Sequence, residues 1–185
     1  FKDLISEVLD LKPGTRQRVA SPLEREHMVD RAFAEAWPEL VGRIRRQTGL
    51  AESALKLIDE LRQALVDPDS LEERLPEVQS DYLSKVAAVY RQYVESLASR
   101  GVTDNPALAM ASAKVNLDQW QGRPVFLVGF DDLTDQQLEL TVRLGEQTAV
   151  TVAITHEDGN PAMAVTDTLL ARLKARGAKV RETTA

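Results

Sequence analysis

Residues 124–134, which read PVFLVGFDDLT, decide how the rest of the chain is interpreted. The apolar run 125–129 has no polar alternation. A run of this kind predicts a buried strand that is covered on both faces, as in a parallel sheet. The sequence before this stretch has helical periodicity, and the sequence after it has the alternation of strand and helix that is typical of α/β proteins.

Two carboxylates follow this strand directly. Asp131 and Asp132 lie just past its carboxyl end, at the edge where open α/β sheets usually hold ligands and metals. Thr134 and Gln137 then form a T-x-x-Q capping box, which predicts that a helix begins there. Two interpretations of the aspartates are therefore open: a metal site, or turn residues with solvated carboxylates. The second is favoured because no third ligand is near in the sequence.

The composition limits the function classes. The 185 residues carry a net charge of −6, with 43% hydrophobic and 28% charged residues and no cysteine. This balance is typical of a globular protein with a packed core, and it argues against a general nucleic-acid coat but not against a local basic patch. Disulfides, thiolate metal sites and cysteine nucleophiles are excluded within these residues. No apolar run approaches the ~18 residues of a membrane span, and no signal peptide is visible. We therefore expect no membrane partner and a cytoplasmic protein.

The first part of the chain is predicted to be a helical bundle. Ser21-Pro22 is a helix start, and Pro38 is expected to break that helix near Trp37. No convincing strand is visible before residue 118. Tyr82, Tyr90 and Tyr93 are at helical spacing, and we interpret them and Trp37 as core residues, with a stacking platform as the less favoured alternative for the three tyrosines. Helices are predicted over residues 1–10, 21–44, 51–65, 81–100 and 105–115.

The last part is predicted to be a small parallel α/β unit. Strands are expected at 125–130 and 149–155, with helices at 134–144 and 162–176 and a last strand at 179–182. The predicted fold class is therefore α/β, with a helical domain over residues 1–117 and a partial parallel α/β unit over 118–185. Because the chain begins at Phe1, we expect it to be part of a longer protein that supplies the other strands.

Five segments together resemble a known family. They are SPLEREHMVDRAFAEA (21–36), LIDELRQALVDPDSLEERL (57–75), LSKVAAVYRQYVESLASRGVTD (83–104), GRPVFLVGFDDLTDQQLELTVRL (122–144) and VTVAITHEDGNPA (150–162). Their order and the Gly129-Phe130 signature resemble AddB/RexB-type subunits of bacterial ATP-dependent helicase–nucleases. These subunits are relatives of UvrD-like superfamily 1 helicases and carry a PD-(D/E)XK nuclease domain. The resemblance covers roughly residues 19–155.

The resemblance implies a partial P-loop NTPase fold whose ATP site is degenerate. In UvrD-like enzymes the corresponding strand ends in an Asp-Glu pair before Phe, and that pair holds Mg²⁺ and activates water. With Phe130 aligned, these positions are Val128 and Gly129, which can neither bind a metal nor accept a proton. The G-x-x-x-x-G-K-[ST] phosphate loop is absent from the chain. We therefore expect no catalytic residue, cofactor or metal here, although the resemblance implies ATP and Mg²⁺ for the parent protein.

The same resemblance implies DNA and an AddA-type helicase subunit as partners, in the processing of DNA double-strand ends. Arg43, Arg45 and Arg46, with Arg16 and Arg18, are candidate phosphate contacts, since such contacts need only local positive charge. The alternative is a solvated helix face paired with acids. Two rival functions stay open: a protein-interaction domain without a nucleic-acid role, and a small enzyme that uses Asp131 or Asp132 with Mg²⁺.

Overall fold

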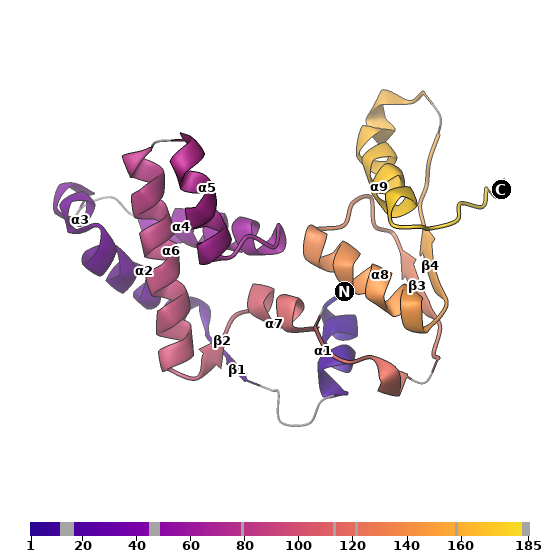
Figure 1. The fold of residues 1–185 in the computed structure, drawn as a ribbon, viewed down its shortest axis with the longest axis horizontal. Coiled ribbons are helices and arrows are strands. Elements are labelled where there is room, and N and C mark those ends of the chain that lie inside the picture. Colours follow the sequence, from indigo (N-terminus) through magenta and orange to yellow (C-terminus); the bar gives the residue numbers. More distant parts are fainter. Residues whose placement is uncertain are drawn as a thin grey trace. The chain divides into compact units, whose positions relative to one another are not determined.

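The computed structural model describes residues 1–11, 17–44, 49–78, 80–112, 114–120, 122–157 and 159–182, with the side chains of 42–44 and 76–78 left out. Within this part the chain is mostly helical and has two small parallel sheets of two strands each (Figure 1). It divides into two compact units, Gly14–Ala111 and a second unit of Phe1–Pro13 with Ser112–Ala185. The predicted boundary was at 117/118, and the first helix was predicted to belong to the helical part.

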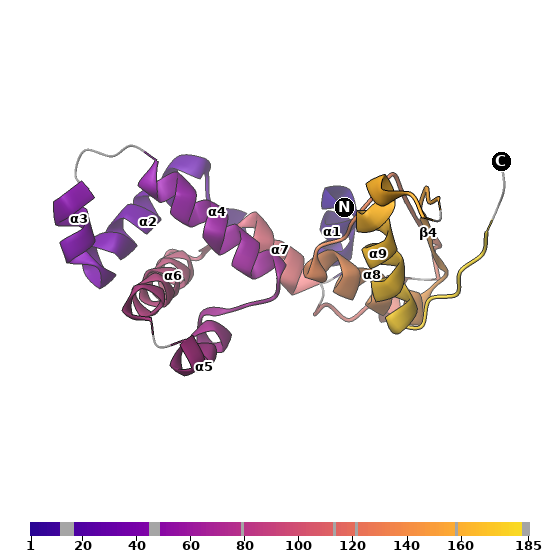
Figure 2. The same ribbon diagram turned by 90° about the horizontal axis from the view of Figure 1, so that it is seen from above.

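The first unit, called the helical unit below, contains six helices and one pair of strands in the described residues (Figure 2). Its core is formed mainly where α2 packs against α6, with α4 beside them. Its elements are β1 (Arg18–Val19), α2 (Pro22–Ala36), α3 (Pro38–Ile44), α4 (Leu50–Gln63), α5 (Pro68–Val78), α6 (Asp81–Ser99), β2 (Val102–Thr103) and α7 (Asn105–Ser112).

Local chemistry explains where α2 begins and ends. Ser21 accepts a hydrogen bond from the Glu24 amide while the Glu24 side chain accepts one from the Ser21 amide, which is a complete capping box. The helix ends at Ala36, and a new helix, α3, begins at Pro38. The predicted break at Pro38 is confirmed, because proline is tolerated only in the first turn of a helix.

The absence of strands before residue 118 was a wrong prediction. Two-residue strands β1 and β2 pair in parallel, with Arg18 opposite Val102 and Val19 opposite Thr103. Such short strands leave almost no periodic pattern in a sequence. They bring the start of α2 next to the end of α6, which closes the helical unit.

The second unit, called the α/β unit below, has one parallel pair, β3 with β4, in register from Val125 opposite Val150 to Val128 opposite Ala153. The leucines of α8 and α9 form a core with Val152 and Ile154 on one face of this pair. The elements are α1 (Lys2–Asp10), η1 (Asp118–Trp120), β3 (Val125–Val128), α8 (Asp135–Gln147), β4 (Val150–Ala153), η2 (Pro161–Met163) and α9 (Ala164–Ala175).

Two predictions about this sheet are wrong. Strand β3 is covered on one face only: Val125 and Leu127 are buried, whereas Phe126 and Val128 are each 68% exposed. The helices of the described chain pack against the inward face, so the apolar residues of the other face are left open. Residues 179–182, predicted as a last strand, have no regular secondary structure.

Candidate functional site

The carboxyl end of β3 was the first candidate site. Gly129 follows the strand with φ of 80°, a left-handed conformation that glycine adopts readily and other residues rarely adopt. Phe130 turns inward, where its ring meets the Phe1 ring edge-to-face at 5.3 Å between centroids. Thr134 then caps α8 through the predicted capping box with Gln137. The sequence around β3 thus makes a strand, a tight turn and a helix start.

The carboxylate of Asp132 is already bound within the chain. It accepts a hydrogen bond from the Leu133 amide at 2.8 Å and one from Arg172 Nη1 at 3.1 Å. Arg172 comes from α9 and also donates to the Leu133 carbonyl at 2.6 Å and to Asp135 Oδ1 at 2.5 Å. This arginine therefore ties α9 to the turn that follows β3.

Asp131, by contrast, faces a hollow of about 440 Å³ that opens beside the ends of both strands. Thr155, just after β4, lines it as well, and η2 and the first turn of α9 supply Met163, Val165 and Thr166. The Thr166 hydroxyl donates to the Met163 carbonyl at 2.7 Å. The hollow therefore combines one carboxylate with a mostly apolar lining, at the edge where α/β proteins hold ligands.

The metal interpretation of the aspartates has no further support in the structure. Across the described ranges, no group of three or more His, Asp and Glu side chains lies close enough to hold a metal ion. His156 is far from His27 in sequence and lies 3.6 Å from Asp167, through Nε2 and Oδ1. With Asp132 bound to an arginine, Asp131 has no second free carboxylate from this turn to share a cation with.

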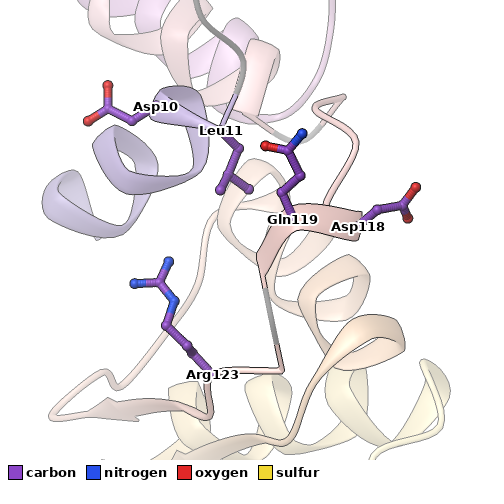
Figure 3. Close-up of a pocket in the computed structure, with 5 residues that line it drawn as sticks. All are labelled: Asp10, Leu11, Asp118, Gln119 and Arg123. Carbon is purple, nitrogen blue, oxygen red and sulfur yellow. The ribbon is translucent and has the colours of Figure 1, made fainter.

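A second hollow, of about 600 Å³, lies in the same unit (Figure 3). It is lined by Asp10 and Leu11 at the end of α1, by Asp118 and Gln119 of η1, and by Arg123. The guanidinium of Arg123 lies over the ring of the buried Trp120 at 4.3 Å, and it pairs with Glu7 on α1 at 3.4 Å. This hollow is polar, and its lining residues include neither a histidine nor a hydroxyl nucleophile.

The candidate phosphate-binding arginines are only partly visible. Arg18 binds both carboxylate oxygens of Glu24 at 2.8 Å, and this partner, together with the Ser21 amide, lowers the pKa of Glu24 to about 2. Arg43 lies on α3, but its side chain is outside the described part of the structure. Arg16, Arg45 and Arg46 are also outside the described residues.

Most other arginines of the helical unit that the structure describes are bound to acids. Arg31 pairs with Glu35, and Arg91 pairs with both Asp69 and Glu72. An arginine that is engaged in this way must give up its carboxylate before it can bind a phosphate. Phosphate contact by Arg43, Arg45 and Arg46 stays a prediction, because the structure does not describe their side chains.

A buried polar network, which the sequence did not predict, lies in the core of the helical unit. Asp104 is completely buried; it forms a very short ion pair with the buried Arg62 and accepts from the Tyr93 hydroxyl at 2.8 Å. Arg25 donates to the same hydroxyl at 2.8 Å and binds Asp59. Burial and the neighbouring Asp104 carboxylate raise the pKa of Tyr93 well above its ordinary value.

The family of the chain can now be stated. A family model described as "ADDB, N-terminal" matches residues 1–176. The chain belongs to the AddB N-terminal family. This membership confirms the resemblance carried by the Gly129-Phe130 stretch and implies the setting of an AddAB helicase–nuclease in DNA repair. No curated protein sequence matches the chain significantly.

The residues that follow the Tyr-rich helix of this AddB region lie in the buried network. Residues 101–104, which read GVTD, end the segment 83–104 that resembles the family. In the structure Val102 is a residue of β2, and Asp104 joins α4, α6 and the start of α7, where it also accepts from the Ala107 amide at 2.9 Å. The sequence therefore shows the aspartate but gives no sign of its partner Arg62.

The AddB region carries no membrane-spanning helix among its described elements, since none is both long enough and apolar enough. The G-x-x-x-x-G-K-[ST] phosphate-binding loop is likewise absent from these 185 residues.

Proposed function

We propose that this AddB region is a non-catalytic scaffold that helps to guide DNA within a helicase–nuclease that processes double-strand ends. Its parent would act in the cytoplasm with an AddA-type partner subunit, and ATP and Mg²⁺ would serve the parent complex at other sites. The proposal extends the family assignment, which covers residues 1–176, to a role for this region itself.

The chemistry at the end of β3 supports this proposal most strongly. A motor at this position needs one carboxylate for Mg²⁺ and a second one to activate water. Here the two positions are an exposed valine, Val128, and Gly129 in a left-handed turn. Asp132, which follows Gly129 in the next turn, has its carboxylate bound by Arg172. The residues present therefore do not fit an ATP–Mg²⁺ site.

ATP hydrolysis tests this part of the proposal. The AddB-type subunit, purified without its partner, is expected to show no hydrolysis above a buffer control, with or without DNA. An Asp131→Asn, Asp132→Asn double variant serves as the matched control, because it removes both carboxylates near the strand. If the unaltered subunit hydrolyses ATP and the double variant does not, the non-catalytic role is refuted. That result would support the rival function, an enzyme that uses Asp131 or Asp132 with Mg²⁺.

Phosphate contact by residues 43–46 is tested by a salt titration. Because phosphate contacts release counterions, DNA affinity should fall steeply with salt, and each lost contact should lower the slope by roughly 0.7–0.9. Arg43, Arg45 and Arg46 replaced together by Ala should therefore weaken binding and flatten the slope. The control replaces Arg31, Arg91 and Arg176, which are paired with acids, and it makes the same change in net charge.

A protein-interaction role without DNA is the second candidate. The open face of β3 supports it, because Phe126 and Val128 expose two large apolar side chains side by side on one strand. Absence of DNA binding by the complex at low salt, together with loss of the partner subunit from a Phe126→Ser, Val128→Thr variant, would favour this function over DNA guidance.

A further inference from the structure

An exposed aromatic ring rests on a second aromatic ring in the helical unit. Tyr82, in the first turn of α6, is 61% exposed although we predicted it to be a core residue. Its ring packs edge-to-face on the ring of Trp37, with 5.4 Å between centroids and 72° between the planes. Tyr90 and Tyr93, further along the same helix, are fully buried. Tyr82 is therefore held in place by packing while much of its surface stays open.

The break between α2 and α3 and the capped start of α6 create this arrangement. Trp37 lies between α2 and α3, where Pro38 starts the new helix, and it packs at the border of the helical core. Ser80 caps α6 through the Leu83 amide and fixes the first turn that carries Tyr82. Figures 1 and 2 show α3 beside the N-terminal part of α6. Both rings are thus positioned by well-defined backbone.

Positive charge lies close by in the sequence and on the same elements. Lys85 is three residues after Tyr82 on α6, a spacing that places both on one helix face. Arg43, Arg45 and Arg46 follow Trp37 in the sequence, but their side chains lie outside the described part of the structure, so the site rests on Lys85 as its cation. An aromatic face beside cationic residues is the combination that binds single strands, since bases stack on the ring and phosphates contact the cations.

We propose that Tyr82, supported by Trp37, is a stacking site for one base of single-stranded DNA. This inference rests on the DNA-guiding function proposed above and adds a residue and a class of ligand to it. A stacked base needs no particular hydrogen-bond pattern, because every base has a π-face. The site would therefore accept a single strand with little regard to sequence and would discriminate against a duplex, whose bases are already stacked.

Affinity for a single-stranded oligonucleotide tests the site in the complete AddB-type protein with its partner subunit. Tyr82→Ala is expected to weaken binding of an oligo-dT by about five-fold or more, while Tyr82→Phe, which keeps the ring, stays within about two-fold of the original protein. The matched control is Leu23→Ala, which removes another apolar side chain of the helical unit that is 63% exposed and should leave affinity unchanged. Because Tyr82 is exposed, circular dichroism should show the fold retained.

The salt dependence separates stacking from phosphate contact. Tyr82→Ala should weaken binding at every salt concentration and leave the slope of log K against log salt unchanged, because no ion is released by a neutral ring. The arginine triple variant described above should change the slope instead. Unchanged affinity for Tyr82→Ala, or a loss equal to that of Leu23→Ala, would overturn the stacking site while leaving DNA guidance intact.

Photo-crosslinking locates the base directly. A single strand with 5-iododeoxyuridine, irradiated in the complex, should form an adduct on the peptide that contains Tyr82, and Tyr82→Ala should remove that adduct. Adducts only on other peptides would overturn the inference. Failure of the unaltered complex to bind any single strand at low salt would instead overturn the proposed DNA-guiding function together with this site.

Discussion

Arg172 Nη1 lies 3.1 Å from Asp132 Oδ1, although the two residues are 40 positions apart. The same guanidinium binds the Leu133 carbonyl and Asp135, so one side chain of α9 holds three groups of the turn between β3 and α8. The turn that follows β3 is thus fixed by an internal cation, and the ion pair ties α9 to the start of α8.

Arg172→Ala should destabilise the α/β unit by about 1–2 kcal/mol, because the side chain is only 27% exposed and its removal leaves three acceptors without their donor. Urea unfolding followed by Trp120 fluorescence in a Trp37→Phe background reports on this unit, since Trp37 belongs to the other one.

Arg176→Ala is the matched control for Arg172. It removes an arginine from the same helix end, but its single pair with Glu139 is half exposed. We expect a loss of at most about 0.5 kcal/mol. Equal losses for the two variants would contradict the role assigned to Arg172.

Asp104→Ala should lower the unfolding free energy of the helical unit by more than the arginine substitutions lower that of the α/β unit. It would remove the buried carboxylate that pairs with the guanidinium of Arg62, and removing one member of a buried pair typically costs about 3–5 kcal/mol. It also removes the side chain that accepts from the Ala107 amide at the start of α7. Unfolding is best followed by Trp37 fluorescence in a Trp120→Phe background.

Asp69→Asn provides the comparison for Asp104. Asp69 also pairs with an arginine, Arg91, but its side chain is 77% exposed, so solvent replaces the lost interaction. The expected loss is below about 1 kcal/mol. A small effect of Asp104→Ala, similar to that of Asp69→Asn, would show that the buried network does not hold the helical unit together.

The network also predicts a pH dependence at the alkaline end. The pKa of Tyr93 is raised above its ordinary value of 10.0 by burial and by the Asp104 carboxylate. The neutral hydroxyl is therefore favoured in the folded state, so its contribution is complete below about pH 10 and is lost as the pH rises from there toward the folded pKa. The helical unit should lose stability in this window.

Tyr93→Phe tests this pH dependence. Without the hydroxyl, the fall in unfolding free energy above about pH 10 should become shallower, and one late-ionising tyrosine should vanish from the absorbance titration near 295 nm. An identical alkaline profile for this variant and the unaltered chain would mean that another group titrates in this window.

The features that the sequence predicted are those determined by neighbouring residues. The capping box of Thr134 with Gln137 and the helix break at Pro38 depend on residues within one turn of each other, so the pattern alone was sufficient. The order of the resembling segments, with the Gly129-Phe130 signature, likewise pointed to the family to which the chain belongs. The family and most helices were therefore predictable, but α5 (Pro68–Val78) was not among the predicted helices, and the DNA role remains a proposal.

The features that the sequence missed depend on distant residues. Asp104 and Arg62 are 42 positions apart, and nothing local in either segment indicates that they meet. On α6 the helical spacing of the three tyrosines was visible, yet only packing decides that Tyr90 and Tyr93 are buried while Tyr82 is exposed. For β3, the apolar run predicts burial of both faces, but burial of the second face requires elements that pack against it. Sequence periodicity thus shows which faces are apolar, and tertiary contacts decide which of them are buried.

Alanine substitutions at two glycines test how the backbone conformation after β3 affects the stability of the α/β unit. Gly129 has φ of 80°, and a Cβ added there meets no atom within 4 Å, so a substitution is opposed by the backbone conformation alone. Gly129→Ala should therefore destabilise the α/β unit by about 1–2 kcal/mol. Gly145, within α8, also has open space around it. Gly145→Ala should instead stabilise by about 0.5–1 kcal/mol, because alanine favours the helix.

The conformation of Gly129 also opposes introduction of the Asp-Glu pair that the resemblance to UvrD-like enzymes implies at positions 128 and 129. Val128→Asp with Gly129→Glu would recreate the acidic pair, but the glutamate would have to adopt the left-handed conformation or shift the turn that Arg172 holds. We expect this variant to be less stable than the unaltered chain and to hydrolyse no ATP, because the chain also has no phosphate loop. Urea unfolding and a phosphate-release assay measure the two effects. Hydrolysis that appears in this variant of the AddB-type subunit without its partner would show that the acidic pair is the only missing part of the site.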